Sequence, residues 1–471
     1  MKSRVRLSDH FTYKKLFRFT LPSVIMAVFT SVYTIVDGLF VSRVVGDSAF
    51  AGMNLIFPVI MIVGAVGMMF GSGGSALISK TLGEGDSKRA NGYFSFLVIA
   101  IAVAGVVLGG AGIAVLRPVA QLLGKNASAD AVENGIVYGF ILLCGMPFLM
   151  MQYAFQSFMI TAEKSTLGFL ITVGAGVTNA VLDAAFILGA HMEIAGAAFA
   201  TIIGQAVGAA LPIVYFACKN RSLLRLGKPR CEGKAFFLSA ANGASELLSN
   251  VSFSVVSMLY NMQLLRLAGD DGVIAYGIIM YMSTVFFNIF FGFSLGAAPL
   301  VGYHYGAENK QELRNLKRKG FLVMGVLGVA LTVIAEAFAS PFARIFATNG
   351  DIFRLAKHGI HLYSAAYLLM GFSVFGSAYF TALNNGLVSG AISTLRSLVY
   401  QCGAVLLLPL FCGMTGVWIA ATVAEALAFA TTMLFFVCMR KKYGYSDKFD
   451  GKSVDEAGKE MIEYKQEDIG E

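Results

Sequence analysis

Five acidic residues lie inside long apolar segments, where an ionised carboxylate is costly. They are Asp37, Asp183, Glu246, Glu336 and Glu425. A charge at the centre of a bilayer costs on the order of 2.5–3.5 kcal/mol even on lenient insertion scales, so each needs a partner or a function. Glu336 is expected near a helix end, within reach of lipid headgroups, which favours a structural role. The other four are candidates for binding a proton or a cation.

The apolar segments that surround these acids indicate the class of protein. The chain has 471 residues, of which 57% are hydrophobic and 14% charged, whereas soluble domains carry roughly 25% charged residues. Apolar stretches of ~20 residues or more, the length that a spanning helix needs, recur along the whole chain. This composition excludes a soluble protein and predicts an all-α polytopic membrane protein. The six cysteines form no CxxC pair and are interpreted as small buried hydrophobes rather than metal ligands.

The pattern of apolar segments predicts twelve transmembrane helices. Their expected bounds are 17–42, 50–72, 92–116, 135–158, 166–189, 194–217, 238–265, 273–303, 320–340, 358–382, 391–412 and 415–438. Most Lys and Arg residues lie in the N-terminal tail and in alternate loops, and such an excess marks the cytoplasmic side. We therefore expect a multi-pass protein of the cell inner (cytoplasmic) membrane with both termini in the cytoplasm. Because these loops explain the net charge of +8, nucleic acid is not an expected partner.

Internal repeats divide the chain into two halves. "VVGDSAFAGMNLIFP" at 44–58 resembles "LAGDDGVIAYGIIMY" at 267–281, and "LGEGDSKRA" at 82–90 aligns with "YGAENKQEL" at 305–313, both with an offset of 223. Parallel repeats of this kind place ligand sites near the interface between the lobes. We expect an N-terminal six-helix lobe at 1–217 and a C-terminal six-helix lobe at 235–440, joined by a basic cytoplasmic connector at 218–234. A polar cytoplasmic tail at 441–471 is expected to be disordered.

A polar pocket is predicted in the first lobe. Asp37 and Asp183 each lie about five residues from the outer end of their helices, at a depth of ~7–8 Å. Asn179 precedes Asp183 by one turn on the same helix face, and Thr201 is expected at a comparable level. Two close carboxylates in a low dielectric cannot both ionise cheaply, so the pair would exchange protons, while Asp37, Asp183 and Asn179 could also hold Na⁺ through oxygen atoms. A hydrogen-bonded contact that only joins helices is the structural alternative.

The second lobe carries different polar residues. Glu246 lies among Asn and Ser residues in "NGASELLSNVS", and neither Glu246 nor Glu425 has an acidic counterpart in the first half. Pro22 precedes Asp37 by 15 residues in the same predicted helix. Because a proline breaks a backbone hydrogen bond and permits a kink, Pro22 is a candidate hinge that could couple bending to the charge at Asp37.

In order and spacing, these motifs resemble the MATE (multidrug and toxic compound extrusion) family of antiporters, in its MepA-like or DinF-like branch. The resemblance covers about residues 10–440 and rests on "SVYTIVDGLFVSRVVGDSAFAGMNLIFP", "NAVLDAAFILG" before "IAGAAFAT", "NGASELLSNVS" and "YHYGAENKQEL". It implies two six-helix lobes in a V shape. It also implies that Asp37 binds the coupling cation or proton, and that Asn179, Asp183 and Thr201 line the same cavity.

The resemblance implies a secondary active antiporter that exports cationic amphipathic compounds in exchange for H⁺ or Na⁺. H⁺ is favoured because two carboxylates dominate the predicted pocket, and Glu246 is similar to an acidic position of another branch. No cofactor and no enzymatic activity are expected, because no nucleophile–base or metal constellation is present. The expected partners are small cationic amphipathic molecules and the lipid bilayer, with the protein acting as a monomer. The alternative is a lipid-intermediate flippase of the same broader superfamily, for which Arg396 is the main candidate cleft arginine.

Overall fold

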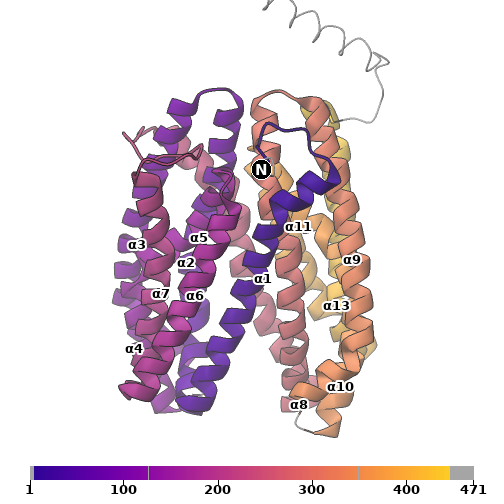
Figure 1. Ribbon diagram of the computed structural model, residues 1–471. Helices are drawn as coiled ribbons and strands as arrows, with labels where there is room; N and C mark the ends of the chain where they lie inside the picture. Colours follow the sequence, from indigo (N-terminus) through magenta and orange to yellow (C-terminus); the bar gives the residue numbers. More distant parts are fainter. Residues whose placement is uncertain (1–4, 126, 348, 446–471) are drawn as a thin grey trace, which may run out of the picture.

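The computed structural model describes residues 5–125, 127–347 and 349–445, and these ranges contain helices and turns but no strand. The helices of the first half are α1 (Tyr13–Val44), α2 (Asp47–Gly83), α3 (Ser87–Leu123), α4 (Ala129–Cys144), α5 (Met146–Thr161), α6 (Ser165–Asp183), the π-helix η1 (Ala184–Gly189) and α7 (Glu193–Ala217). Those of the second half are α8 (Gly233–Gly306), α9 (Lys310–Phe346), α10 (Gly350–Ser364), α11 (Tyr367–Ala382), α12 (Gly386–Thr394), the π-helix η2 (Leu395–Tyr400), α13 (Gln401–Cys438) and α14 (Arg440–Tyr443). Figure 1 shows the two halves side by side, the first in indigo to magenta and the second in salmon to yellow.

The predicted twelve spans are present once two long helical segments are divided at glycine turns. In the described part of the chain, eight helical segments are long and apolar enough to cross a membrane, or ten if the bent pairs α4–α5 and α10–α11 each form one span. The segment α8 contains Gly269 at a φ of 62°, and α13 contains Gly413 at a φ of 55°. Glycine adopts a positive φ without steric cost, so each position is a turn between two helices.

The two halves repeat the same helix caps and the same left-handed residues at corresponding helix ends. The Asp86 side chain caps the first turn of α3, and the Asn309 side chain caps that of α9, 223 residues later. Glu163 and Asn384 precede α6 and α12 with left-handed backbone angles, φ 57° and φ 55°. A capping side-chain oxygen satisfies a backbone N–H group that has no partner within the helix. The predicted repeat of two halves is therefore also visible in individual helix caps and turns.

The two lobes meet at the end of the molecule that carries the N-terminus, here called the N-terminal end (Figure 1). Gly83 of α2 lies against the backbone carbonyl of Tyr303, and Gly306 of α8 lies against that of Lys80, with no space for a Cβ at either glycine. Both residues of each contact map onto the other contact with the offset of 223. The absence of side chains lets the backbones approach this closely, so the lobe interface follows the same pseudo-two-fold relation as the sequence.

Contacts between the lobes extend only part of the way toward the opposite end. Gly73 packs on the Ser239 carbonyl, and the deepest polar contact joins Asn250 Nδ2 to Met68 Sδ at 3.8 Å. Beyond that level, the residues that the structure describes form no hydrogen bond, ion pair or ring contact between the lobes. The close contacts between the described parts of the two lobes therefore lie on the N-terminal side, and the molecule is closed at that end.

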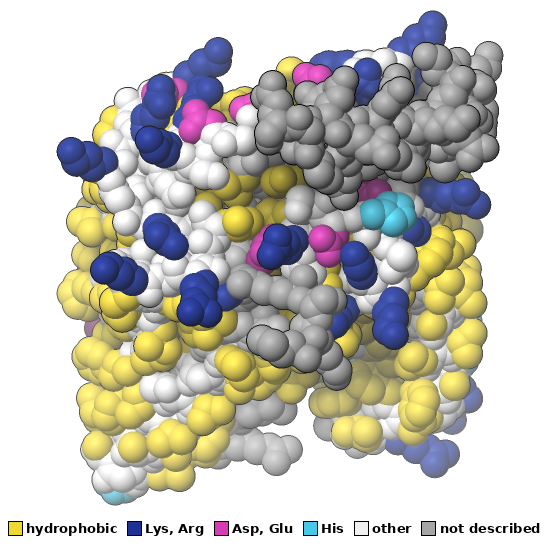
Figure 2. Space-filling view, turned by 45° about the horizontal axis from the view of Figure 1, so that its top comes forward, with side chains coloured by type: hydrophobic (Ala, Val, Ile, Leu, Met, Phe, Trp, Pro, Cys, Tyr) yellow, Lys and Arg dark blue, Asp and Glu magenta, His cyan; other side chains and the backbone are white. Residues whose placement is uncertain are grey.

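Charge and apolar side chains are distributed as a membrane protein requires. Lys and Arg side chains gather on the N-terminal end, and apolar side chains cover the flanks of both lobes (Figure 2). Apolar side chains exposed on the flanks of a polytopic helical protein face lipid, because the bilayer takes the place of a core there. The chain is a multi-pass membrane protein.

The prediction of a disordered tail from residue 441 is wrong for its first residues. Tyr443 and Tyr445 are 5% and 0% exposed, and their rings stack with centroids 6.1 Å apart. Tyr445 also packs edge-on against Tyr379 of α11. Two tyrosines thus anchor a segment whose overall composition is polar, because buried aromatic area outweighs the polar average locally. Residues 446–471 lie outside the described residues.

Candidate functional site

Three helices of the first lobe carry the predicted polar pocket: α1, α6 and α7. Asp37 lies two turns before the end of α1, and Asp183 is the last residue of α6. Small residues bring these helices together at this level. A Cβ on Gly204 of α7 would lie 2.9 Å from the Cβ of Asn179, and a Cβ on Gly176 of α6 would lie 2.9 Å from the Phe29 ring of α1. The close approach places the three polar helix faces around one space.

The structure brings the four predicted pocket residues of the first lobe together. Asn179, Asp183 and Thr201 are 1%, 3% and 8% exposed, and Asp37 is half-buried. Asn179 Nδ2 donates to Thr201 Oγ1 at 3.4 Å, and the Thr201 hydroxyl donates to the Ala197 carbonyl at 2.9 Å. The carboxyl groups of Asp37 and Asp183 lie within hydrogen-bonding reach of each other. At this separation and burial, a single shared proton is more favourable than two negative charges.

Unsatisfied oxygen atoms point to a ligand in this pocket. One side-chain oxygen each of Asp37, Asn179 and Asp183 is buried without a hydrogen-bond partner among the described residues. Buried polar atoms are satisfied in the large majority of cases, so three such oxygens close together call for a bound proton, water or cation as their partner. The donor set consists of carboxylate, amide and hydroxyl oxygens, which suits a proton, a hard cation such as Na⁺ or an organic cation.

The pocket does not have the composition of a transition-metal site. Within the described ranges, no group of three or more His, Cys, Asp or Glu side chains could hold a metal ion. A Na⁺ ion would therefore need the Asn179 amide oxygen in addition to the two carboxylates. Oxygen ligands of this kind are the ones that hard cations prefer.

Two tyrosines in the pocket were missed by sequence reasoning. Tyr138 of α4 is 4% exposed and lies close to Thr201 and to both carboxyl groups. Tyr33 of α1 also lies close to Asp37 and Asp183. Their rings add aromatic faces that attract organic cations. The i, i+4 spacing from Tyr33 to Asp37 could have revealed the first tyrosine, whereas nothing in the sequence distinguishes Tyr138 from other apolar-segment tyrosines.

Glu246 lies outside this pocket, on α8 of the second lobe. Its side chain is half-buried and forms no hydrogen bond within the described part of the chain, while its backbone carbonyl accepts from Asn250 Nδ2 at 2.9 Å. Asn250 in turn reaches Met68 of α2. Glu246 is therefore placed beside the inter-lobe contact, where a ligand between the lobes would meet it, and not beside Asp37.

Glu425 is held by the arginine that the flippase alternative singled out. Arg396 of η2 donates from Nε to both oxygens of Glu425, at 2.9 and 3.0 Å, and its Nη2 lies 2.8 Å from Oε1. The two side chains are 14% and 5% exposed. The Arg396 guanidinium also lies over the Phe287 ring, 5.7 Å from its centroid. This buried bidentate pair neutralises both charges and links η2 to α13.

Pro22 lies in the interior of α1, which runs without a break from Tyr13 to Val44. It is adjacent to the inter-lobe contact, because a Cβ on Gly292 of α8 would lie 2.8 Å from the Ser23 carbonyl and 2.7 Å from the Val24 Cα. A bend at Pro22 would move the half of α1 that carries Asp37 relative to this contact. Its role as a hinge stays a prediction.

These features define a class of protein: a helical membrane protein of two repeated lobes, with one buried oxygen-lined pocket suited to cations. The model of the MatE family matches residues 22–185 and 247–404, which is more than half of the chain. The chain belongs to the MatE family, and it is a membrane transporter rather than an enzyme.

Relatives of known name cover nearly the whole chain. The multidrug export protein MepA of Staphylococcus haemolyticus (strain JCSC1435) is 25% identical over 435 residues, 91% of this chain and 94% of the relative. The MepA protein of Staphylococcus aureus (strain MSSA476) is 25% identical over 441 residues with the same coverage.

Solved structures show the same fold. A crystal structure of MATE in complex with MaL6 superposes with a TM-score of 0.88 at 21% identity, covering 95% of this chain and 100% of the other. An outward-facing multidrug resistance MATE family transporter of the MOP superfamily superposes with a TM-score of 0.85 at 21% identity and the same coverage. The predicted fold class, with twelve helices in two bundles, is confirmed.

Proposed function

We propose that this protein is a secondary active antiporter that exports cationic amphipathic compounds from the cell in exchange for H⁺, with Na⁺ as the alternative coupling ion. The observation that carries the proposal is the Asp37–Asp183 pair, two carboxyl groups within hydrogen-bonding reach that each keep one buried oxygen without a partner among the described residues. The staphylococcal relatives that carry the name multidrug export protein support the substrate class.

Exchange follows from competition for one negative charge. A drug cation binds the pocket when the carboxyl pair is ionised, and a proton that arrives at Asp37 or Asp183 neutralises the pair and releases the drug. Each ligand shifts the conformational equilibrium only by its differential affinity for the two states. Na⁺, held by the two carboxylates and Asn179, would compete in the same way. The Tyr33 and Tyr138 rings would supply the apolar and cation–π contacts that an aromatic drug needs.

The sidedness of the lobe contacts supports a direction for the proposed cycle. The excess of Lys and Arg on the N-terminal end supports a cytoplasmic position for that end and for both termini, in the inner membrane. In this orientation, the described conformation is closed to the cytoplasm and able to open to the outside. It is the state in which drug leaves and the coupling ion enters. Because the pocket lies within one lobe of one chain, a monomer is sufficient for function.

The lipid-intermediate flippase receives less support from the geometry. A carrier of anionic diphosphate headgroups needs free cationic side chains in its cleft. Arg396, the main candidate for that role, is committed to Glu425 through three contacts of 2.8–3.0 Å. An arginine paired in this way has little remaining positive potential for a phosphate.

The test is efflux of ethidium in everted membrane vesicles that contain either the wild-type protein or Asp37→Asn. A gradient of H⁺ alone is imposed first, and then a gradient of Na⁺ alone. Asp130→Asn is the matched control, because Asp130 is an exposed acid in the first turn of α4. We expect wild type and the Asp130→Asn variant to accumulate dye under the H⁺ gradient, and Asp37→Asn to fall to the level of vesicles without the transporter.

The outcomes separate the alternatives. Transport driven only by Na⁺ would identify Na⁺ as the coupling ion and keep the antiport proposal. Equal transport by wild type and Asp37→Asn would show that Asp37 has only a structural role, in contacts between helices. Absence of dye movement under either gradient would contradict the drug antiporter and make the flippase the next assay.

A further inference from the structure

The eight residues before α1 form a strap across the closed N-terminal end. We call residues 5–12 the N-terminal strap. Leu7 and Phe11 of the strap are 1% and 0% exposed, so the segment is packed into the protein although it is not helical. In Figure 1 it passes over the second lobe before α1 returns between the lobes. Burial of two large apolar side chains fixes the position of the strap.

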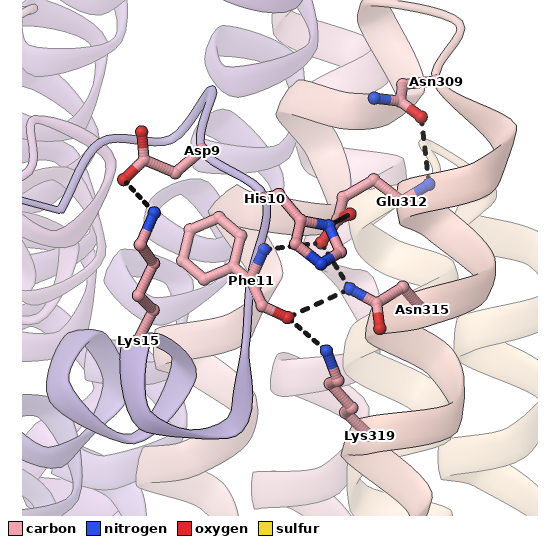
Figure 3. Close-up of polar contacts among 8 residues, drawn as sticks. All are labelled: Asp9, His10, Phe11, Lys15, Asn309, Glu312, Asn315 and Lys319. Carbon is pink, nitrogen blue, oxygen red and sulfur yellow. Dashed lines mark hydrogen bonds and ion pairs between the residues drawn. The ribbon is translucent and has the colours of Figure 1, made fainter. Parts of the chain in front are cut away.

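The strap is bonded to both lobes. On the first lobe, the Leu7 backbone N–H donates to Glu163 Oε1 at 2.7 Å. On the second lobe, the Phe11 N–H donates to Glu312 Oε1 at 2.9 Å, and His10 Nδ1 lies 2.6 Å from Glu312 Oε2 (Figure 3). A single chain segment therefore connects the lobes at the end that must open for a ligand to enter from that side.

Glu312 is the centre of the second-lobe contact. The carboxylate lies in the first turn of α9 and its residue is 3% exposed. Asn315 Nδ2 donates to Glu312 Oε1 at 2.7 Å and to the Phe11 carbonyl at 3.0 Å, and Lys319 Nζ donates to the same carbonyl (Figure 3). An acidic side chain in the first turn of a helix interacts favourably with the helix dipole, and Glu312 has this position in α9. Hydrogen bonds to a buried charged group are among the strong ones.

The second half repeats this arrangement on the first lobe. The connector before α8 lies along the start of α3: Arg225 N donates to Asn91 Oδ1 at 2.6 Å, and Gly227 N donates to Ser95 Oγ at 2.9 Å. The segment that leads into each half is thus bonded to the third helix of the opposite half. This reciprocal pattern places the strap in the same pseudo-symmetric interface as the glycine contacts.

The two contacts differ in charge placement and burial. The position 223 residues before Glu312 is Arg89 of α3, whose Nη2 lies 3.7 Å from Glu232 Oε2 of the connector. Tyr93 Oη donates to Glu232 at 2.6 Å, and this hydrogen bond lowers the pKa of Glu232 below its usual value. Glu232 is 32% exposed in its side chain, against 4% for Glu312. Because water screens an exposed pair, the buried Glu312 contact is the stronger of the two.

We propose that Glu312 is a positioning residue of the transport cycle: its carboxylate holds the N-terminal strap on the second lobe while the N-terminal end is closed, and it releases the strap when that end opens. The inference rests on the proposed alternating transport. It assigns to Glu312, His10 and Asn315 a role in setting the balance between the two states, without any contact with drug or coupling ion. Because the strap continues into α1 and is also bonded to the first lobe at Leu7, a movement of the lobes away from each other pulls it away from Glu312.

The test measures the balance of states directly by the distance between two spin labels. The labels are placed at Lys88→Cys and Gln311→Cys, exposed positions at the starts of α3 and α9, after the six native cysteines are replaced by serine. Glu312→Gln keeps the side-chain shape and removes the charge. Glu308→Gln is the matched control, because Glu308 is an exposed acid on the turn before α9.

In Glu312→Gln we expect the ratio of long to short label separations to rise roughly tenfold relative to wild type, since charged hydrogen bonds to the strap are lost. Glu308→Gln should match wild type. An unchanged ratio in Glu312→Gln, with a melting temperature equal to that of the control, would overturn the proposal. If Glu312→Gln does not fold, Asn315→Ala removes a donor to both the carboxylate and the Phe11 carbonyl, and must shift the ratio in the same direction.

This readout needs no substrate, so it separates the strap from the proposed function. A shift in the ratio without ethidium efflux by the wild type would contradict the antiporter and support the strap. Efflux by the wild type without a shift in Glu312→Gln would contradict the strap alone.

Discussion

At the residue scale, the candidate site is built around Asp37 and Asp183, two carboxyl groups that lie close together in an otherwise apolar lobe. Asp183 is 3% exposed, and one oxygen of each partner has no hydrogen bond within the described residues. Such a pair changes its charge when a single proton enters or leaves, and this change alters the affinity for any cation nearby. Asn179 and Thr201 add neutral oxygens that can complete a cation site without adding charge.

The Arg396–Glu425 pair differs from this site because it is already neutral. Removing one partner of a buried pair leaves an unpaired charge and costs about 3–5 kcal/mol, whereas replacing both by apolar residues is often neutral. We expect Arg396→Met to lower the melting temperature in detergent, and the double variant Arg396→Met/Glu425→Leu to recover most of it. The double variant should retain ethidium efflux. Loss of efflux at wild-type stability would show instead that the pair takes part in transport.

The part of the candidate site that could be predicted from the sequence consists of residues whose type is unusual in an apolar helix. Asp37 and Asp183 are recognisable because a carboxylate in an apolar helix needs a reason, and Asn179 follows from its one-turn spacing to Asp183. Tyr138 could not be predicted, since tyrosine is common in membrane helices and the pocket residues near it are on other helices. The pairing of Arg396 with Glu425 was also hidden, because it depends on how η2 packs against α13.

At the scale of elements, glycines determine how closely the lobes close. Gly306 leaves no space for a Cβ against the Lys80 carbonyl, whereas Gly110 of α3 has no neighbouring atom within 4 Å. Overpacking such a contact costs typically about 1–3 kcal/mol. This cost destabilises the conformation in which the N-terminal end is closed, since the Gly306–Lys80 contact belongs to that conformation.

We therefore expect Gly306→Val to open the N-terminal end and to expose Ser239, which is 0% exposed in the closed state. The measurement is the rate of maleimide labelling of Ser239→Cys in a background without native cysteines. Gly306→Val should raise the rate, while Gly110→Val, at an open position, should leave it unchanged. Equal rates in all three proteins would contradict the assignment of the glycine contact to the closed state.

The helices themselves could be predicted from the sequence, but their ends and the bends between them only in part. Apolar length marks the spans, and polar turns such as "LGEGDSKRA" mark most ends. The bends of 61° between α4 and α5 and of 54° between α10 and α11 lie within predicted single spans. Gly145 and Pro147, at the start of α5, mark the first of these bends in the sequence, whereas no proline stands near Ala365 to mark the second.

At the scale of the whole molecule, the described parts of the two repeated lobes make their closest contacts at the N-terminal end. The internal repeat predicted this architecture, and the contacts of Gly83 and Gly306 show the pseudo-two-fold relation in the structure. The sequence did not reveal which end is closed, since one sequence can populate more than one conformation. The closed end carries the strap and the basic surface, and the pocket lies in the first lobe, between this end and the opposite one.

The most direct measurement of the central claim is proton release from the purified protein in weakly buffered detergent when ethidium is added. We expect ethidium binding to release protons from the wild type near neutral pH. In Asp37→Asn, binding should weaken and release should vanish, because the pair can no longer exchange a proton for a cation. Ethidium binding to the wild type without proton release, or equal release from Asp37→Asn, would contradict the claim that drug and proton compete for the Asp37–Asp183 pair.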